Sequence, residues 1–269
     1  MKIADATFSK AMSDRVFWAS SALLFALSLG VTIVWSASMS AMGGMPMPGG
    51  WSLSMVWMRM PGQSWSGVAI SFVAMWLVMM MAMMLPSLAP MLARYRQAVR
   101  EVETSRLGLR TMLVGAGYFF VWFVFGVAVF PLGSALSAME MQQPALARTV
   151  PLVTGLVVVI AGALQFGAWK SHDLGRCAVA LARPGTRPAN TVIAWGHGMR
   201  LGLHCGSCCG NLMAILLVIG IMDLRAMALV TAALAAERLA PAGQRVARVI
   251  GVIVIGIGLF LITRVAAAR

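Results

Sequence analysis

The chain alternates between long apolar runs and short polar segments that carry most of its charge. A helix needs about 20 apolar residues to cross the hydrocarbon core of a bilayer. The pattern therefore predicts an all-α fold, a polytopic transmembrane helical bundle that forms a single domain over residues 1–269. About seven helices are expected, with six as the alternative because the sixth run is short. The predicted spans are 17–36, 67–92, 111–136, 151–169, 201–222, 226–239 and 249–263.

Composition supports a membrane protein. Of the 269 residues, 60% are hydrophobic and 11% are charged, and the mean hydropathy is +0.86. A soluble domain has about 25% charged residues, so a soluble globular enzyme is excluded. A net charge of +13 would point to nucleic acid in a soluble protein, but here the basic residues lie between the apolar runs. We expect the lipid bilayer as a partner and no nucleic acid.

The basic residues also predict an orientation. The N-terminus and segments 93–110, 170–200 and 238–248 contain 16 of the 21 Lys and Arg residues. Basic loops stay in the cytoplasm, so the split predicts a multi-pass protein of the bacterial inner (plasma) membrane with a cytoplasmic N-terminus. With seven spans, the C-terminus lies outside.

Three of the four cysteines lie within five residues, in the predicted first turns of the fifth span and near its cytoplasmic end. At about 100° per residue, Cys205 and Cys209 share one helix face, with Cys208 and His204 beside it. Thiolates select soft metals, so Cu(I) is the expected ion and zinc the second possibility. His172 and Cys177 follow the fourth span on the same side and are candidate additional ligands. The alternative is that these cysteines are small packing residues.

Methionine is abundant, with 23 residues. The predicted outer segment 37–65 is rich in Met, and Met75, Met79 and Met83 form a stripe along the second span. Thioethers bind Cu(I), so Met79 and Met83 are candidate relay ligands between the outer segment and the cysteines. The alternative is that these side chains fill gaps in an apolar core, as Met commonly does.

Glycines repeat at every fourth position around the cysteines. This spacing lets another helix approach closely and suits assembly into a membrane complex. The glycines are Gly198, Gly202, Gly206 and Gly210.

Two acidic residues, Glu237 and Asp223, lie near predicted helix ends. We expect them to be solvated there and to pair with Arg238 and Arg225.

The cysteine region resembles DUF2182, a family of bacterial integral membrane proteins described as predicted metal-binding. The resemblance covers residues 66–262. Asp173 and Gly210 depart from the pattern, since many relatives have a cysteine and an aromatic residue there. Membership implies a metal-binding membrane protein with a copper-handling role. The matching motifs are Met83-Met84-Leu85-Pro86, Gln165 with Lys170 and Cys177, the run from Gly202 to Met213, Gly220-Ile221-Met222-Asp223-Leu224, and Glu237.

These observations lead to one main hypothesis and two alternatives. The main hypothesis is a bacterial inner-membrane metal-handling protein that binds Cu(I) through the Cys/His cluster and acts as a chaperone, insertion factor or transporter. It requires a protein that donates or receives the metal. The alternatives are a membrane thiol oxidoreductase that uses the cysteines and a structural subunit of a membrane complex. The sequence shows no hydrolase or nucleotide-binding motif, so catalytic residues are not assigned.

Overall fold

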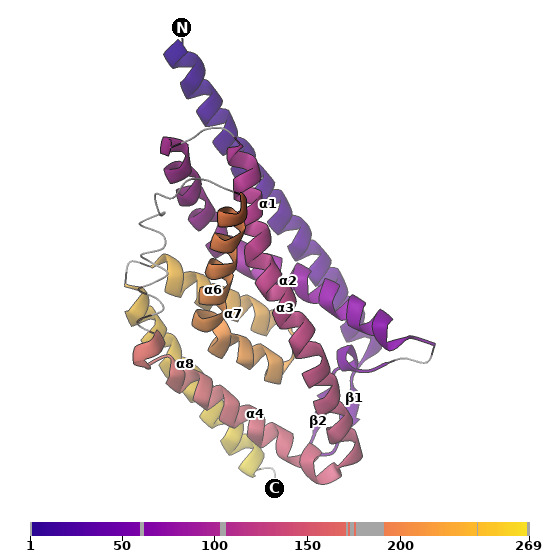
Figure 1. Cartoon of the computed structure of the whole chain (residues 1–269). Coiled ribbons are helices and arrows are strands. Elements are labelled where there is room, and N and C mark those ends of the chain that lie inside the picture. Colours follow the sequence, from indigo (N-terminus) through magenta and orange to yellow (C-terminus); the bar gives the residue numbers. More distant parts are fainter. Residues whose placement is uncertain are drawn as a thin grey trace.

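The computed structural model of the chain describes residues 2–59, 62–102, 106–170, 172, 175, 191–240 and 242–267. It confirms the all-α class: long helices form a bundle, and the described sheet is a single two-stranded hairpin (Figure 1). The helices are α1 (Lys2–Met42), η1 (Met55–Trp57), α2 (Trp65–Val102), α3 (Leu107–Gln142), α4 (Pro144–Leu164), α6 (Thr191–Ile219), α7 (Leu224–Leu239) and α8 (Gly243–Ala267).

Among the described residues, six helices are long and apolar enough to cross a membrane. They are α1, α2, α3, α4, α6 and α8. Helix α7 has 16 residues, which at 1.5 Å per residue make about 24 Å, less than the roughly 30 Å of a hydrocarbon core. The sixth predicted span, 226–239, is therefore not among the helices of membrane-spanning length.

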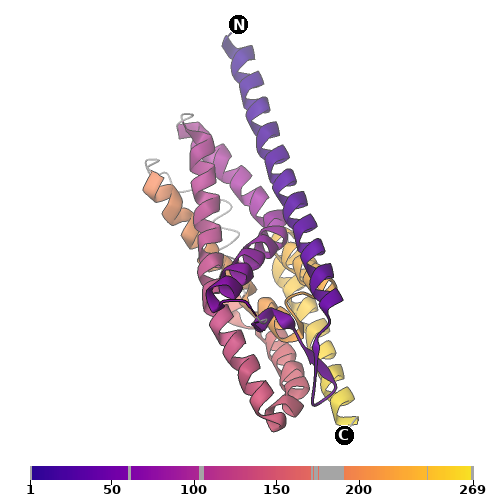
Figure 2. The same ribbon diagram turned by 90° about the vertical axis from the view of Figure 1, so that its right-hand side faces the viewer.

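The short helix α7 nevertheless turns the chain back before α8 begins. The carboxylate of Asp223 accepts hydrogen bonds from the backbone N–H groups of Arg225 and Ala226, which starts α7 immediately after α6. Asp223 is thus a helix cap rather than a partner of the Arg225 side chain. Because α7 runs back toward the middle of α6, the two termini lie at opposite ends of the molecule (Figures 1 and 2).

Helices α4 and α8 pack closely in antiparallel directions. A Cβ added at Gly155 would meet the Ile262 side chain at 2.6 Å, and one added at Gly162 would meet Ile255 at 2.8 Å. Small residues allow this approach between helices in a membrane. The contact fixes the start of α8 beside the end of α4, where several polar side chains converge.

The glycine repeat on α6 is used inside the chain, where α3 runs alongside α6 in the same direction. A Cβ at Gly198 would collide with the Val114 carbonyl, and one at Gly202 would lie 2.9 Å from the Tyr118 carbonyl. The next glycine, Gly206, faces an α3 ring. These glycines thus admit another helix, as predicted, and that helix is α3. Gly210 alone among the four has nothing within 4 Å of an added Cβ.

The helices extend further than their apolar runs. The predicted loop 93–110 is largely helical, because α2 continues to Val102 through Pro86 and Pro90 and α3 begins at Leu107. Helix α6 likewise begins at Thr191, so the cysteines lie in its middle rather than in its first turns. Hydropathy marks only the apolar part of a helix, whereas Arg and Lys favour helix almost as much as Leu.

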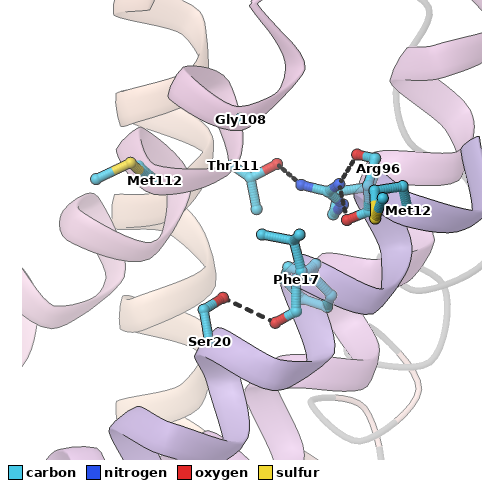
Figure 3. A pocket seen from close by; sticks show the side chains of 9 residues that line it. Met12, Phe17, Ser20, Arg96, Gly108, Thr111 and Met112 are labelled. Atoms are coloured by element: carbon cyan, nitrogen blue, oxygen red, sulfur yellow. Dashed lines mark hydrogen bonds between the residues drawn. The ribbon is translucent and has the colours of Figure 1, made fainter. Parts of the chain in front are cut away.

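Arg96 joins the ends of α1, α2 and α3. Its guanidinium donates to the hydroxyl of Ser13 at 2.8 Å and to that of Thr111 at 3.4 Å, and it lies 4.8 Å from the centre of the Phe17 ring. These side chains line an apolar pocket of ≈ 690 Å³ between the three helices (Figure 3). Arg96 is 5% exposed, so this basic residue anchors α1 instead of facing solvent.

The Met-rich segment forms a small cover at the other end of the bundle (Figure 1). Strands β1 (Met45–Met47) and β2 (Trp51–Leu53) pair as an antiparallel hairpin. The indole N–H of Trp51 donates to the Ala147 carbonyl of α4 at 2.8 Å, and the Trp57 ring lies against Gly133 of α3. The segment is thereby fixed to the turn between α3 and α4.

Candidate metal-binding site

Two cysteines of α6 form the centre of the site. Cys205 and Cys209 are one helical turn apart and share a face, as their spacing predicted. Their Sγ atoms lie 3.8 Å from each other. Both side chains are buried, with Cys205 3% and Cys209 0% exposed. Two soft donors are therefore held together away from solvent.

A third sulfur comes from α2. Met84 is 0% exposed, and its Sδ lies 3.8 Å from Cys205 Sγ. Metal–thiolate bonds are about 2.3 Å long, so two sulfurs on one ion at tetrahedral to trigonal angles lie about 3.8–4.0 Å apart. The separations of Cys205 from Cys209 and from Met84 both fit this requirement.

A guanidinium from α7 faces the two thiols. Arg238 Nη2 donates to Cys209 Sγ at 2.7 Å and to Cys205 Sγ at 2.9 Å, while Nη1 donates to Ser87 Oγ at 3.2 Å. On the α3 side, Tyr118 Oη lies 2.8 Å from Cys205 Sγ. Both groups can donate to a thiolate, and such charge-assisted hydrogen bonds are stronger than neutral ones. The surroundings therefore suit deprotonated sulfur.

A buried ion pair lies beside this cluster. Glu237 is 2% exposed, and its carboxylate lies 2.8 Å from Lys170 Nζ and accepts from Gln165 Nε2 at 2.7 Å. Lys170 Nζ also donates to the Cys208 carbonyl at 2.6 Å. The expectation of a solvated Glu237 paired with Arg238 is thus wrong. The reason is that α7 packs inside the bundle, where a carboxylate requires a partner.

The other predicted ligands have different places. Cys208 is buried and packs against Ala247 of α8, and its side chain also adjoins that of Cys209. His204 is half-buried, and His172 is exposed. Met79 and Met83 are buried in the core. Cys177 lies outside the described residues.

The described residues contain no group of three or more His, Cys, Asp and Glu side chains placed to hold a metal ion. The structure brings together two thiols and a thioether instead. Met84, Tyr118 and Arg238 were not among the predicted site residues. Met84 lies in the motif Met83-Met84-Leu85-Pro86, and Arg238 follows Glu237, so both stand within or beside the stretches that carried the family resemblance.

The fold and this cluster define a class: an α-helical protein suited to a membrane, with a buried group of soft sulfur donors at its centre. Residues 73–261 match the model of the PpoB2 family, which is described as copper chaperone. The chain therefore belongs to this copper chaperone family. The description of this family agrees with the copper-handling role that the resemblance to DUF2182 implied, although the name of the matched family is different. No curated protein and no solved structure shows significant similarity to the chain.

Proposed function

We propose that this protein is a copper chaperone or insertion factor of the bacterial inner membrane that binds Cu(I) through Cys205 and Cys209. The observation that carries the proposal is the pair of buried contacts that the Cys205 thiol makes with the Cys209 thiol and with the Met84 thioether, at 3.8 Å in each case. Three sulfur donors suit a soft monovalent ion and disfavour hard cations such as Mg²⁺.

The surroundings of the thiols support ion binding. A thiol must lose its proton to bind a metal, and the resulting thiolate is costly to bury without compensation. Arg238 and Tyr118 supply hydrogen bonds to Cys205, and Arg238 supplies another to Cys209. Burial keeps water away from the sulfurs, which protects Cu(I) from ligand exchange with solvent.

Transfer of copper requires donors beyond the binding site. Met79 and Met83 precede Met84 on α2, which begins near the Met-rich cover at the end of the bundle. We keep these two as relay ligands between that cover and the cysteines. Cys208, His204, His172 and Cys177 are the remaining candidate donors, for steps in which a partner protein gives or takes the ion. The basic loops support a cytoplasmic N-terminus.

Copper content tests the proposal. The protein is purified in detergent under reducing, oxygen-free conditions, supplied with Cu(I), desalted and measured by mass spectrometry. We expect bound copper in the wild type and its loss in the double variant Cys205→Ser/Cys209→Ser. Cys208→Ser is the comparison variant, because Cys208 is equally buried on α6 and adjoins Cys209 but is not one of the two proposed ligands. Gel filtration and circular dichroism establish that each variant is folded.

Equal copper content in the wild type and the folded double variant would overturn the proposal. A greater loss in Cys208→Ser than in the double variant would contradict the choice of ligands.

A further inference from the structure

We propose that Arg238 makes the site selective for a monovalent ion, so that Cu(I) is bound in preference to Zn(II). The inference rests on the proposed function and extends it from the sulfur donors to the charge that accompanies them. Its basis is the pair of hydrogen bonds from one guanidinium nitrogen to both sulfurs, at 2.7 and 2.9 Å.

The charges at the site can be counted from its contacts. Two thiolates and one guanidinium sum to −1. Met84, Tyr118 and Ser87 contact these groups and carry no charge, and the Cys208 side chain, which adjoins Cys209, adds none as a protonated thiol. The neighbouring Lys170 and Glu237 form an ion pair and cancel each other. A monovalent ion therefore makes the buried site neutral, whereas a divalent ion leaves it with one positive charge.

Burial turns this difference into selectivity. In bulk water one excess charge would be screened, but Cys205 and Cys209 are at most 3% exposed. An uncompensated charge in such surroundings is strongly destabilising. Thiolates alone do not discriminate in this way, because sulfur ligands suit both Cu(I) and zinc. The charge of Arg238 thus supplies the selectivity between Cu(I) and Zn(II) that the sulfur donors alone do not give.

The position of Arg238 is fixed by more than the thiols. Its Nη1 atom donates to Ser87 Oγ at 3.2 Å, while Nη2 contacts the sulfurs. The guanidinium stays charged at every physiological pH and offers several donors in a rigid plane, so it can serve α2 and α6 at once. Arg238 contacts the proposed ligands and acts on the metal through charge, which makes it a specificity-determining residue.

The test compares Arg238→Met with Arg238→Lys and wild type. Each purified protein is equilibrated with Cu(I) and Zn(II) under reducing, oxygen-free conditions in the presence of a competing chelator, and the bound ratio is measured by mass spectrometry. We expect the preference for Cu(I) over Zn(II) to fall by roughly tenfold or more in Arg238→Met, because two thiolates and Zn(II) are then neutral. Arg238→Lys keeps the positive charge and most of the preference. Arg225→Met is the matched control, because it removes an exposed arginine from the same helix outside the site, and it should leave the ratio near the wild-type value.

A folded Arg238→Met protein with an unchanged ratio would overturn the inference while leaving Cu(I) binding itself intact. A wild type that binds no Cu(I) would instead remove the proposed function. If Arg238→Met does not fold, Met84→Cys provides the second test, since a third thiolate brings the sum to −2. That variant should shift the ratio toward Zn(II), and an unshifted ratio would again contradict the role of charge.

Discussion

The thioether sulfur of Met84 lies 3.8 Å from the thiol of Cys205, although 121 residues separate them in the chain. The contact exists because the apolar part of α2 presents Met84 to the middle of α6. Met80, one turn earlier on α2, is equally buried. The two methionines therefore form a matched pair for testing the role of the thioether.

Replacing Met84 with Leu should weaken Cu(I) binding by about tenfold while leaving the fold intact, because Leu has a similar volume but no sulfur. Competition with a Cu(I) chelator measures the affinity. Met80→Leu should bind Cu(I) as the wild type does. Equal affinities of the two variants would exclude Met84 as a ligand.

The Lys170–Glu237 pair should contribute to stability rather than to metal choice. Glu237→Leu leaves the Lys170 ammonium in a buried site without its carboxylate, a change that costs about 3–5 kcal/mol. We expect a clearly lower melting temperature in detergent. The double variant Lys170→Met/Glu237→Leu removes both charges and should recover most of the loss. A double variant as unstable as Glu237→Leu would contradict this account.

The contact between α3 and α6 should tolerate no added atoms at its closest points. A Cβ at Gly202 would lie 2.9 Å from the Tyr118 carbonyl and from Val121 Cβ, so Gly202→Ala should cost about 1–3 kcal/mol. Gly210→Ala has open space and should be neutral or slightly stabilising, since Ala favours helix over Gly. Thermal unfolding of the two purified variants measures the difference, and similar losses in both would argue against this packing.

The two ends of the chain should lie on opposite sides of the membrane. The N-terminus and C-terminus lie at opposite ends of the molecule, and the basic loops favour a cytoplasmic N-terminus (Figures 1 and 2). A C-terminal alkaline phosphatase fusion should therefore be active and a C-terminal green fluorescent protein fusion dark. A fusion after Gly220 provides the control, because that turn is expected on the same side as the C-terminus. If neither phosphatase fusion is active, the predicted orientation is wrong and both sites lie in the cytoplasm.

Bound copper should protect the buried thiols from chemical modification. Among the described residues, Cys205, Cys208 and Cys209 are not joined in disulfides. Loading with Cu(I) should slow the labelling of Cys205 and Cys209 by a small maleimide in detergent more than it slows the labelling of Cys208. Peptide mass spectrometry measures the labelling of each cysteine. A thiol oxidoreductase would instead show a reversible loss of labelling after mild oxidation in the absence of metal. That result would favour the alternative function.

Much of the architecture could be predicted from the sequence. Apolar runs of membrane-spanning length dictate helices, since a backbone without water must satisfy its own hydrogen bonds. The spacing of Cys205 and Cys209 predicted a shared face, and the glycine repeat predicted a close helix contact. The predicted helix ends were too short, because arginines such as Arg96 extend a helix beyond the hydrophobic segment that marks it in the sequence.

Only the tertiary structure decided which side chains meet the thiols. Met84 and Met83 are adjacent in the chain, and the approach of α2 to α6 determines that Met84 contacts Cys205. The return of α7 into the bundle likewise places Arg238 on the sulfurs and Glu237 on Lys170, whereas the sequence suggested a solvated helix end. The sequence by itself determined the helices and the soft donors on α6, because these depend on local periodicity. The third sulfur and the compensating charge depend on packing between distant helices, which local periodicity does not encode.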